Sequence, residues 1–88
     1  MKVAFKNSFA KDLKKITDKE TLNRVKAVIE QVKQVESLQE MENIKKLKGG
    51  DRYYRIRIGN FRLGLIVEGE TVTFVRFLHH KEIYRFFP

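Results

Sequence analysis

Residues 52–65 restrict the fold of this chain more than any other stretch. Apolar and polar residues alternate along it, Gly59-Asn60 interrupts the pattern, and the alternation then resumes. Two alternating segments around a two-residue loop of this kind are typical of a β-hairpin with a primed turn. The predicted cross-strand pairs are Ile58 with Phe61, Arg57 with Arg62, Ile56 with Leu63, and Arg55 with Gly64.

This hairpin separates apolar from basic side chains, because neighbouring residues of a strand point to opposite faces. An arginine directly opposite another arginine destabilises a strand pair. The pairing of Arg57 with Arg62 therefore indicates a role outside the fold, with a polyanion as the candidate ligand. The apolar face is predicted to hold Ile56, Ile58, Phe61, Leu63 and Leu65, and the basic face Arg55, Arg57 and Arg62.

The net charge of +8 also favours an anionic partner, and the two basic residue types are unevenly placed. Residues 1–48 hold eleven of the twelve lysines, whereas residues 49–88 hold six of the seven arginines. Lysine suits a solvated helix face, while the planar arginine fork matches a phosphate bidentately. The arginines therefore indicate a site, and the lysines indicate solubility and a long-range field.

Length and composition exclude several classes of protein. Eighty-eight residues are enough for one domain, predicted over 1–88. The absence of cysteine excludes disulfides and thiolate chemistry. No long apolar run predicts a membrane span, and Met1–Lys6 is too short and polar for a signal peptide. A cytoplasmic location is the default expectation.

The first half of the chain predicts a strand and two helices. Lys2–Phe5 is a candidate strand, and Asn7 or Ser8 is the expected cap of a helix with apolar positions at Phe9, Leu13 and Ile16. Thr17 and Glu20 have the spacing of a capping box for the next helix. Its apolar stripe is Leu22, Val25, Ile29 and Val32. Further on, Met41, Ile44 and Leu47 have helical spacing and predict one or two turns before Gly49-Gly50-Asp51.

The second half predicts two more strands and a short terminal helix. A turn at Gly69-Glu70 pairs Val67 with Val72 and Leu65 with Phe74. Continued alternation places Thr73, Val75, Phe77 and His79 on the arginine face. It also sends Arg76 to the core face, which predicts a bulge, an edge position or a snorkelling side chain. The expected fold class is α+β: two N-terminal helices on a twisted, mainly antiparallel four-stranded sheet, with a helix in residues 79–88.

These residues leave RNA cleavage without a metal open as a candidate chemistry. His79 and His80 are adjacent and form a poor chelate, and no glycine-rich phosphate loop is present. Cleavage requires a base for a 2′-hydroxyl, cations for the phosphorus-centred transition state, and an acid for the leaving oxygen. The basic face can supply the cations, a histidine the base or acid, and Tyr84 a stacking or orienting group. A structural role remains an alternative for both His79 and Tyr84.

The order of these elements resembles the RelE/ParE superfamily, toxins of bacterial and archaeal type II toxin–antitoxin modules. The likeness covers essentially the whole chain and is most specific in two motifs, Tyr54-Arg55-Ile56-Arg57-Ile58-Gly59-Asn60-Phe61-Arg62 and the His79-to-Tyr84 spacing. The RelE branch is the most similar. That branch implies a ribosome-dependent endoribonuclease that cleaves mRNA in the A site through attack of the 2′-hydroxyl.

The resemblance also implies site residues and partners. The implied catalytic set is Arg55, Arg57, Arg62, His79 and Tyr84, and the implied RNA-binding set is Lys46, Lys48, Arg52, His80, Lys81 and Arg85. Some relatives have a lysine pair at the two central-strand positions, and a guanidinium deprotonates far less readily, which favours His79 as the base. Relatives often have histidine-arginine at residues 79–80, so the choice of histidine stays open.

The implied partner is a RelB-like antitoxin with an acidic or amphipathic segment, bound in a heterodimer or heterotetramer. Ribosome and mRNA are the other partners, and neither a cofactor, a metal nor a membrane is expected. Two alternatives remain open. One is a ParE-like inhibitor of DNA gyrase without RNase activity. The other is a degenerate toxin that only binds or represses.

Overall fold

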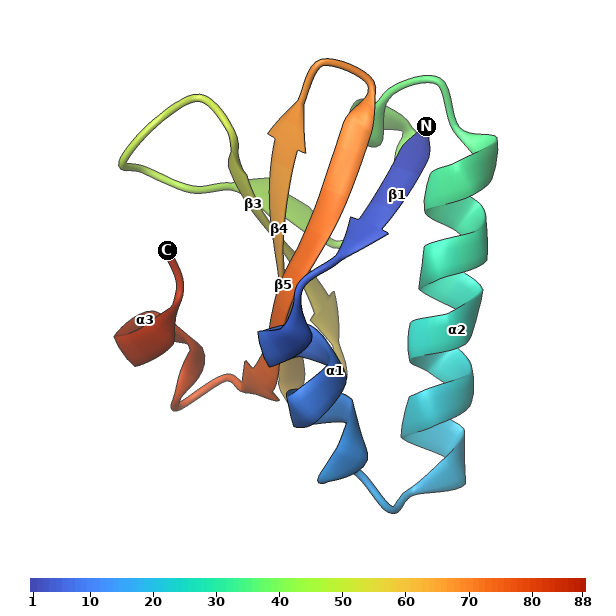
Figure 1. Cartoon of the computed structure of the whole chain (residues 1–88), viewed down its shortest axis with the longest axis vertical. Helices are drawn as coiled ribbons and strands as arrows, with labels where there is room; N and C mark the ends of the chain where they lie inside the picture. The colour runs from blue at the N-terminus through green and yellow to red at the C-terminus, as the bar shows by residue number, and fades with distance from the viewer.

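Five strands form one mixed sheet in the order β1-β5-β4-β3-β2 in the computed structural model, which describes residues 1–88 (Figure 1). Adjacent strands are antiparallel, except that β1 runs parallel to β5. The α+β class is confirmed, but the predicted sheet of four strands is wrong because it has five. The strands are β1 (Lys2–Phe5), β2 (Ile44–Lys46), β3 (Tyr53–Ile58), β4 (Phe61–Glu68) and β5 (Thr71–His79).

The additional strand is β2, where helical turns were predicted. Only a single 3₁₀ turn, η1 (Leu38–Glu40), precedes it, with a capping box between Ser37 and Glu40. Asn43 then adopts a positive φ of 60°, which redirects the chain so that β2 can pair with β3. The helical spacing was misleading because Met41 belongs to the core while Ile44 lies on an edge strand.

Three helices accompany the sheet: α1 (Asn7–Lys14), α2 (Lys19–Gln34) and α3 (Ile83–Phe86). Figure 1 shows α2 along one side of the sheet and α3 on the opposite side. Val25 and Val32 are buried on the inner side of α2, and burial of each contributes about 1.5–3 kcal/mol. Asp18 caps α2 by accepting from the Glu20 amide, so the capping box predicted from Thr17 is wrong by one residue.

The central hairpin has the predicted register. All four predicted pairs between β3 and β4 are present, and so are Val67–Val72 and Leu65–Phe74 between β4 and β5. Gly59 has a φ of +57° at the first loop position, a conformation that glycine adopts without steric strain. Local sequence therefore determines the placement of Arg55, Arg57 and Arg62.

A β-bulge interrupts the pairing of β4 with β5. Leu65 lies opposite Phe74 and Gly64 lies opposite Arg76, so Val75 is an extra residue in β5. The expected bulge near Arg76 is confirmed. Beyond it the alternation reverses, and the prediction that Phe77 and His79 lie on the arginine face is wrong. Phe77 is buried in the core, and His79 lies opposite Phe61.

Helix α1 supplies partners for the bulge. β1 covers β5 only from Thr71 to Phe74, and α1 lies beside the rest of β5. The Ser8 hydroxyl donates to the carbonyl oxygen of Val75 at 2.6 Å, and the Asp12 carboxylate accepts from the Phe77 amide at 2.9 Å. The prediction that Asn7 or Ser8 caps α1 is wrong, since Lys6 precedes the helix and makes no side-chain cap.

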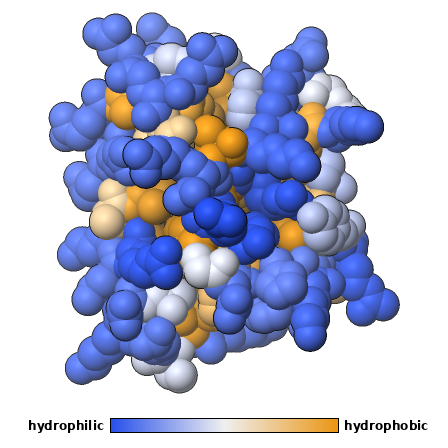
Figure 2. Space-filling view, turned by 180° about the vertical axis from the view of Figure 1, so that it is seen from behind, coloured by the Kyte–Doolittle hydropathy of each residue, from blue (hydrophilic) through white to orange (hydrophobic).

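The core lies between α1, α2 and one face of the sheet. Nine side chains are almost fully buried there and under α3, and Phe74, Phe77 and Ile56 are the largest of them by volume. Seen from behind, the surface is mostly hydrophilic, with apolar atoms visible in patches between polar side chains (Figure 2). No helix has both the length and the apolar composition required to cross a bilayer.

Candidate functional site

Three arginines of the central hairpin lie on the sheet face opposite the α2 core. Arg55 and Arg57 come from β3, and Arg62 comes from β4. None of them has a carboxylate partner: the ion pairs of the protein are Lys33–Glu30, Lys46–Asp51, Arg52–Glu68 and Arg76–Asp12. The charge of these three guanidinium groups is therefore available to an anionic ligand.

The guanidinium groups of the opposed pair Arg57 and Arg62 bind different acceptors. Arg62 Nη1 donates to the carbonyl oxygens of Phe61 and Gly59, at 2.9 and 3.0 Å. Arg57 Nη2 donates to Asn43 Oδ1 at 3.1 Å. All acceptors are neutral, so these bonds orient the guanidinium groups without neutralising them. Together with Arg55 they border an open pocket of about 350 Å³.

Two residues of this pocket were missed by the sequence analysis. Lys45 lies directly opposite Arg55 across the β2–β3 pair, and Asn43 holds Arg57 through both its side chain and its carbonyl oxygen. Both belong to the segment that was predicted to be helical. The asparagine itself was the available signal, since asparagine is enriched where a chain turns with positive φ.

Tyr84 is brought to the arginine face by α3. The Arg55 guanidinium carbon lies 4.7 Å from the centre of the Tyr84 ring, within the range of a cation–π interaction. The tyrosine is 70% exposed, so its hydroxyl and one ring face remain accessible to a ligand. The predicted proximity of Tyr84 to the arginines is therefore present in the structure.

The position beside Gly64, opposite Arg55, is closed to a ligand. The ring of Phe87 fills it, so that a Cβ atom on Gly64 would lie 2.7 Å from ring carbons. Phe87 is almost fully buried there and packs edge-on against Tyr53. Any phosphate site must therefore lie on the Arg57 and Lys45 side of Arg55.

The two histidines follow β5 and lie with their rings 4.4 Å apart, although adjacent residues of a regular strand would point apart. His79 packs edge-on against Phe61, and its Nδ1 accepts from the Lys81 amide at 3.3 Å. The His80 amide donates to the Asn60 carbonyl oxygen at the hairpin turn. Partial burial, followed by the charges of His79, Arg62 and Lys81, lowers the pKa of His80. The charge of Arg62 is therefore one of the causes that disfavour the imidazolium form of His80.

The predicted RNA-binding residues do not gather at one place. Lys46 shares a sheet face with Tyr54, away from the arginines, and its Nζ lies 3.7 Å from Asp51. Arg52 pairs with Glu68 at 3.3 Å. Lys48, Lys81 and Arg85 are exposed. Arg85 belongs to α3 and Lys81 to the turn before it, whereas Lys48 lies in the loop between β2 and β3.

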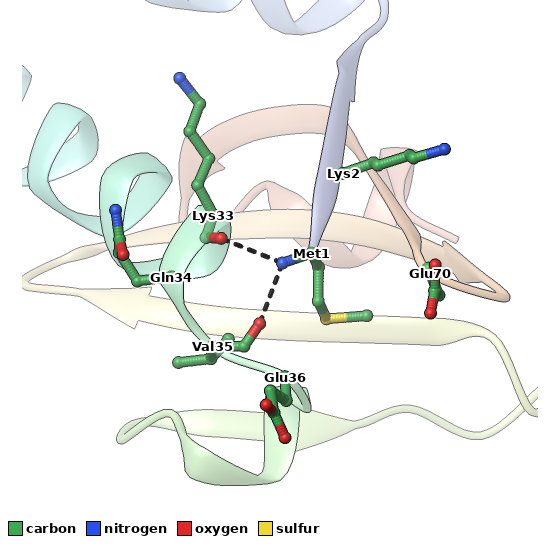
Figure 3. Close-up of a pocket in the computed structure, with 7 residues that line it drawn as sticks. All are labelled: Met1, Lys2, Lys33, Gln34, Val35, Glu36 and Glu70. Atoms are coloured by element: carbon green, nitrogen blue, oxygen red, sulfur yellow. Dashed lines mark hydrogen bonds between the residues drawn. The ribbon is translucent and has the colours of Figure 1, made fainter.

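A larger cavity elsewhere is a poor candidate for chemistry. It measures about 710 Å³ and lies at the end of α2, where the Met1 amino group donates to the carbonyl oxygens of Lys33 and Val35 (Figure 3). The same amino group also donates to the Val32 carbonyl oxygen. These bonds satisfy carbonyl groups at the helix end. No group of three or more histidine, cysteine or carboxylate residues converges as a metal site.

Sequence comparison finds relatives over nearly the whole chain. Residues 3–84 match the family model described as the ParE toxin of the type II toxin–antitoxin system, parDE. The protein named Toxin RelE3 of Methanocaldococcus jannaschii is 46% identical over 89 residues, which cover 100% of both chains. A second protein of that organism, Putative toxin RelE1, is 42% identical over 57 residues, or 65% of this chain and 62% of the relative.

Structural comparison finds the same fold. The crystal structure described as the RelB-RelE antitoxin–toxin complex from Methanococcus jannaschii contains a chain with a TM-score of 0.82 and 44% identity, covering 97% of this chain and 99% of its own. The YoeB dimer from Staphylococcus aureus has a TM-score of 0.74 at 19% identity, over 91% and 97% of the two chains. At that identity the second match shows the fold alone.

Proposed function

This chain belongs to the ParE toxin family of type II toxin–antitoxin systems and is a RelE-like toxin, and from this premise we propose that it is a ribosome-dependent endoribonuclease. Its substrate in this proposal is mRNA in the ribosomal A site, and its cleavage inhibits translation. The observation that carries the proposal is the set of three arginines without carboxylate partners, with Tyr84 held against one of them.

The proposed reaction breaks one phosphodiester bond without a metal. A base removes the proton of a 2′-hydroxyl, and the resulting oxygen attacks the adjacent phosphorus. The bond to the 5′-oxygen breaks, an acid protonates that oxygen, and a 2′,3′-cyclic phosphate remains. Arg57 and Arg62 stabilise the extra negative charge of the transition state, while Tyr84 stacks on a base or orients the phosphate.

Arginine is a poor general base at neutral pH, so a histidine fills this part of the proposal. The lowered pKa of His80 increases the fraction of its neutral, proton-accepting form, and the His80 amide donates to the Asn60 carbonyl oxygen at the hairpin turn. His79 lies on the Phe61 side. We therefore assign the base or acid role to His80. His79 is assigned the role of positioning the adjacent His80 ring.

The partner in this proposal is an antitoxin of the RelB kind. The relative of known structure at 44% identity is described as a RelB-RelE complex. The net charge of +8 and the unpaired arginines favour an acidic segment that covers the pocket bordered by Arg55, Arg57 and Arg62. Binding of this segment would exclude RNA, in a heterodimer or a heterotetramer.

Inhibition of DNA gyrase is the second candidate, because the matching family description names the ParE toxin. Such an inhibitor needs a docking surface but no convergent cations and no acid–base group. The arrangement of Arg55, Arg57 and Arg62 around one pocket, with Tyr84 against Arg55, is not required for docking, and it therefore favours RNA cleavage.

A translation assay separates the two candidates. Ribosomes programmed with a defined mRNA receive the purified chain, and primer extension maps the cuts. The proposal expects cuts in the A-site codon that disappear for the double variant Arg57→Ala/Arg62→Ala. Intact mRNA together with arrest of gyrase supercoiling by the same preparation would establish the alternative instead.

A further inference from the structure

Three aromatic residues at the C-terminal end cover one row of positions across the sheet. The row runs from Arg55 on β3 through Gly64 on β4 to Arg76 on β5, as the register shows. Tyr84 covers Arg55 at 4.7 Å, Phe87 fills the space over Gly64, and Phe86 covers Arg76 at 5.1 Å. Each position of the row thus receives a different ring.

Arg76 differs from Arg55 because an ion pair with Asp12 of α1 fixes its side chain. Its Nε donates to Asp12 Oδ2 at 2.8 Å and its Nη2 donates to Asp12 Oδ1 at 3.0 Å. The Asp12 side chain is 3% exposed, and it also accepts from the Phe77 amide. A bidentate pair of this kind holds the guanidinium plane in one orientation, which presents a flat face to Phe86.

Helix α3 is fixed by a buried side chain at its start and another just after its end. The helix has only four residues, Ile83 is buried at its start and Phe87 is buried just after its end. Two anchors define an axis, but Tyr84 and Phe86 project from it and are 70% and 53% exposed. The contact of Phe86 with Arg76 is a third attachment of the helix, beside Ile83 and Phe87. It would set how far the helix turns Tyr84 toward Arg55.

We propose that Asp12 and Arg76 are positioning residues that orient α3 through Phe86 and thereby place Tyr84 against Arg55. A carboxylate on α1 thus controls a site at the other end of the chain, through the residue beside the β-bulge. The geometric part stands on the contacts alone. Its consequence for RNA cleavage rests on the proposed function.

Nuclear magnetic resonance of the free protein tests the geometric part. We expect the Tyr84 ring to shift the Nε–H proton of Arg55 upfield, and Tyr84→Leu gives the reference value without the ring. We expect Phe86→Leu and Arg76→Lys to move this resonance most of the way to the reference value. Phe86→Tyr keeps the ring and is expected to restore the wild-type shift. An unchanged shift in Phe86→Leu would overturn the proposal.

A matched control and a second readout separate positioning from general stability. Phe5 is 52% exposed, nearly the same as Phe86, and lies on β1. Phe5→Leu is expected to leave both the Arg55 resonance and cleavage unchanged. Phe86→Leu is expected to lower the single-turnover rate about 10- to 100-fold with unchanged RNA affinity. If wild-type protein cleaves no RNA, the proposed function fails, and the resonance shift still decides the positioning proposal.

Discussion

The two strand pairs that flank β4 use arginine in opposite ways. Between β3 and β4 the ladder is regular, and Arg57 and Arg62 face each other with only neutral oxygen acceptors. Between β4 and β5 the ladder is bulged, and Arg76 forms a bidentate pair with a buried carboxylate. The first pair keeps charge available to a ligand, and the second uses charge to fix the shape of the protein.

This difference has a thermodynamic consequence. The hairpin arginines lie opposite each other, so removing one relieves repulsion and breaks only bonds to neutral groups. Removing one partner of the Arg76–Asp12 pair leaves an uncompensated charge, and removing Asp12 also leaves the Phe77 amide without its acceptor. Variants of the hairpin arginines should therefore reduce activity more than stability. Variants of the Arg76–Asp12 pair should chiefly reduce stability.

The largest expected effect is the loss of stability in Asp12→Ala. Because the substitution breaks a buried ion pair and a hydrogen bond to β5, we expect the free energy of unfolding to fall by about 3–5 kcal/mol. Urea denaturation followed by circular dichroism measures it. The matched control is Asp51→Ala, whose pair with Lys46 is exposed and whose loss should leave the midpoint unchanged. Equal midpoints for the two variants would show that the buried pair contributes little.

The same contrast explains how much of the fold the sequence could predict. The β3–β4 register depends on neighbours in the chain, on alternation and on a glycine with positive φ, and it was predicted residue by residue. The position of the bulge depends on Ser8 and Asp12, more than sixty residues before it. A break could be expected from the misplaced Arg76, but its consequence for Phe77 required the packing of α1.

The candidate site also has parts that depend on nearby residues of the chain and parts that depend on distant ones. Arg55, Arg57 and Arg62 share one face as predicted, because the hairpin is a local structure, whereas the contact of Tyr84 with Arg55 joins two elements that are distant in the chain. His79 was misplaced because the bulge reverses the alternation before it. Lys45 was missed because a three-residue edge strand has too little sequence signal to outweigh a helical spacing.

Arg62→Ala is expected to have the opposite profile from Asp12→Ala. Removal of one cation from the transition-state site should lower the single-turnover cleavage rate about 10²–10³-fold. The free energy of unfolding should stay within about 0.5 kcal/mol or rise, since repulsion with Arg57 is relieved. Lys11→Ala removes the same charge from α1 and controls for the net field. A strong loss of stability in Arg62→Ala would show that this arginine is structural.

The smallest expected effect concerns the two histidines. The bulge reverses the alternation of β5 before them, so that His80 takes the role that the sequence favoured for His79. His80→Ala is expected to slow single-turnover cleavage about 100-fold, and His79→Ala less, because the charge of Arg62 acts on His80 while the His79 ring packs against Phe61. A larger effect of His79→Ala would show that the ring orientations change when RNA binds.

The pKa of His80 gives an independent measure of its distance from the arginine face. A positive charge nearby disfavours the imidazolium form, so Arg62→Ala should raise the pKa of His80, as followed by histidine resonances in a pH titration. It should remain below its usual value, because partial burial, the largest cause of the shift, is unchanged. The acidic limb of the cleavage profile should move with it. If the pKa of His80 does not respond to Arg62→Ala, the ring lies outside the field of the arginine site and cannot serve as its base.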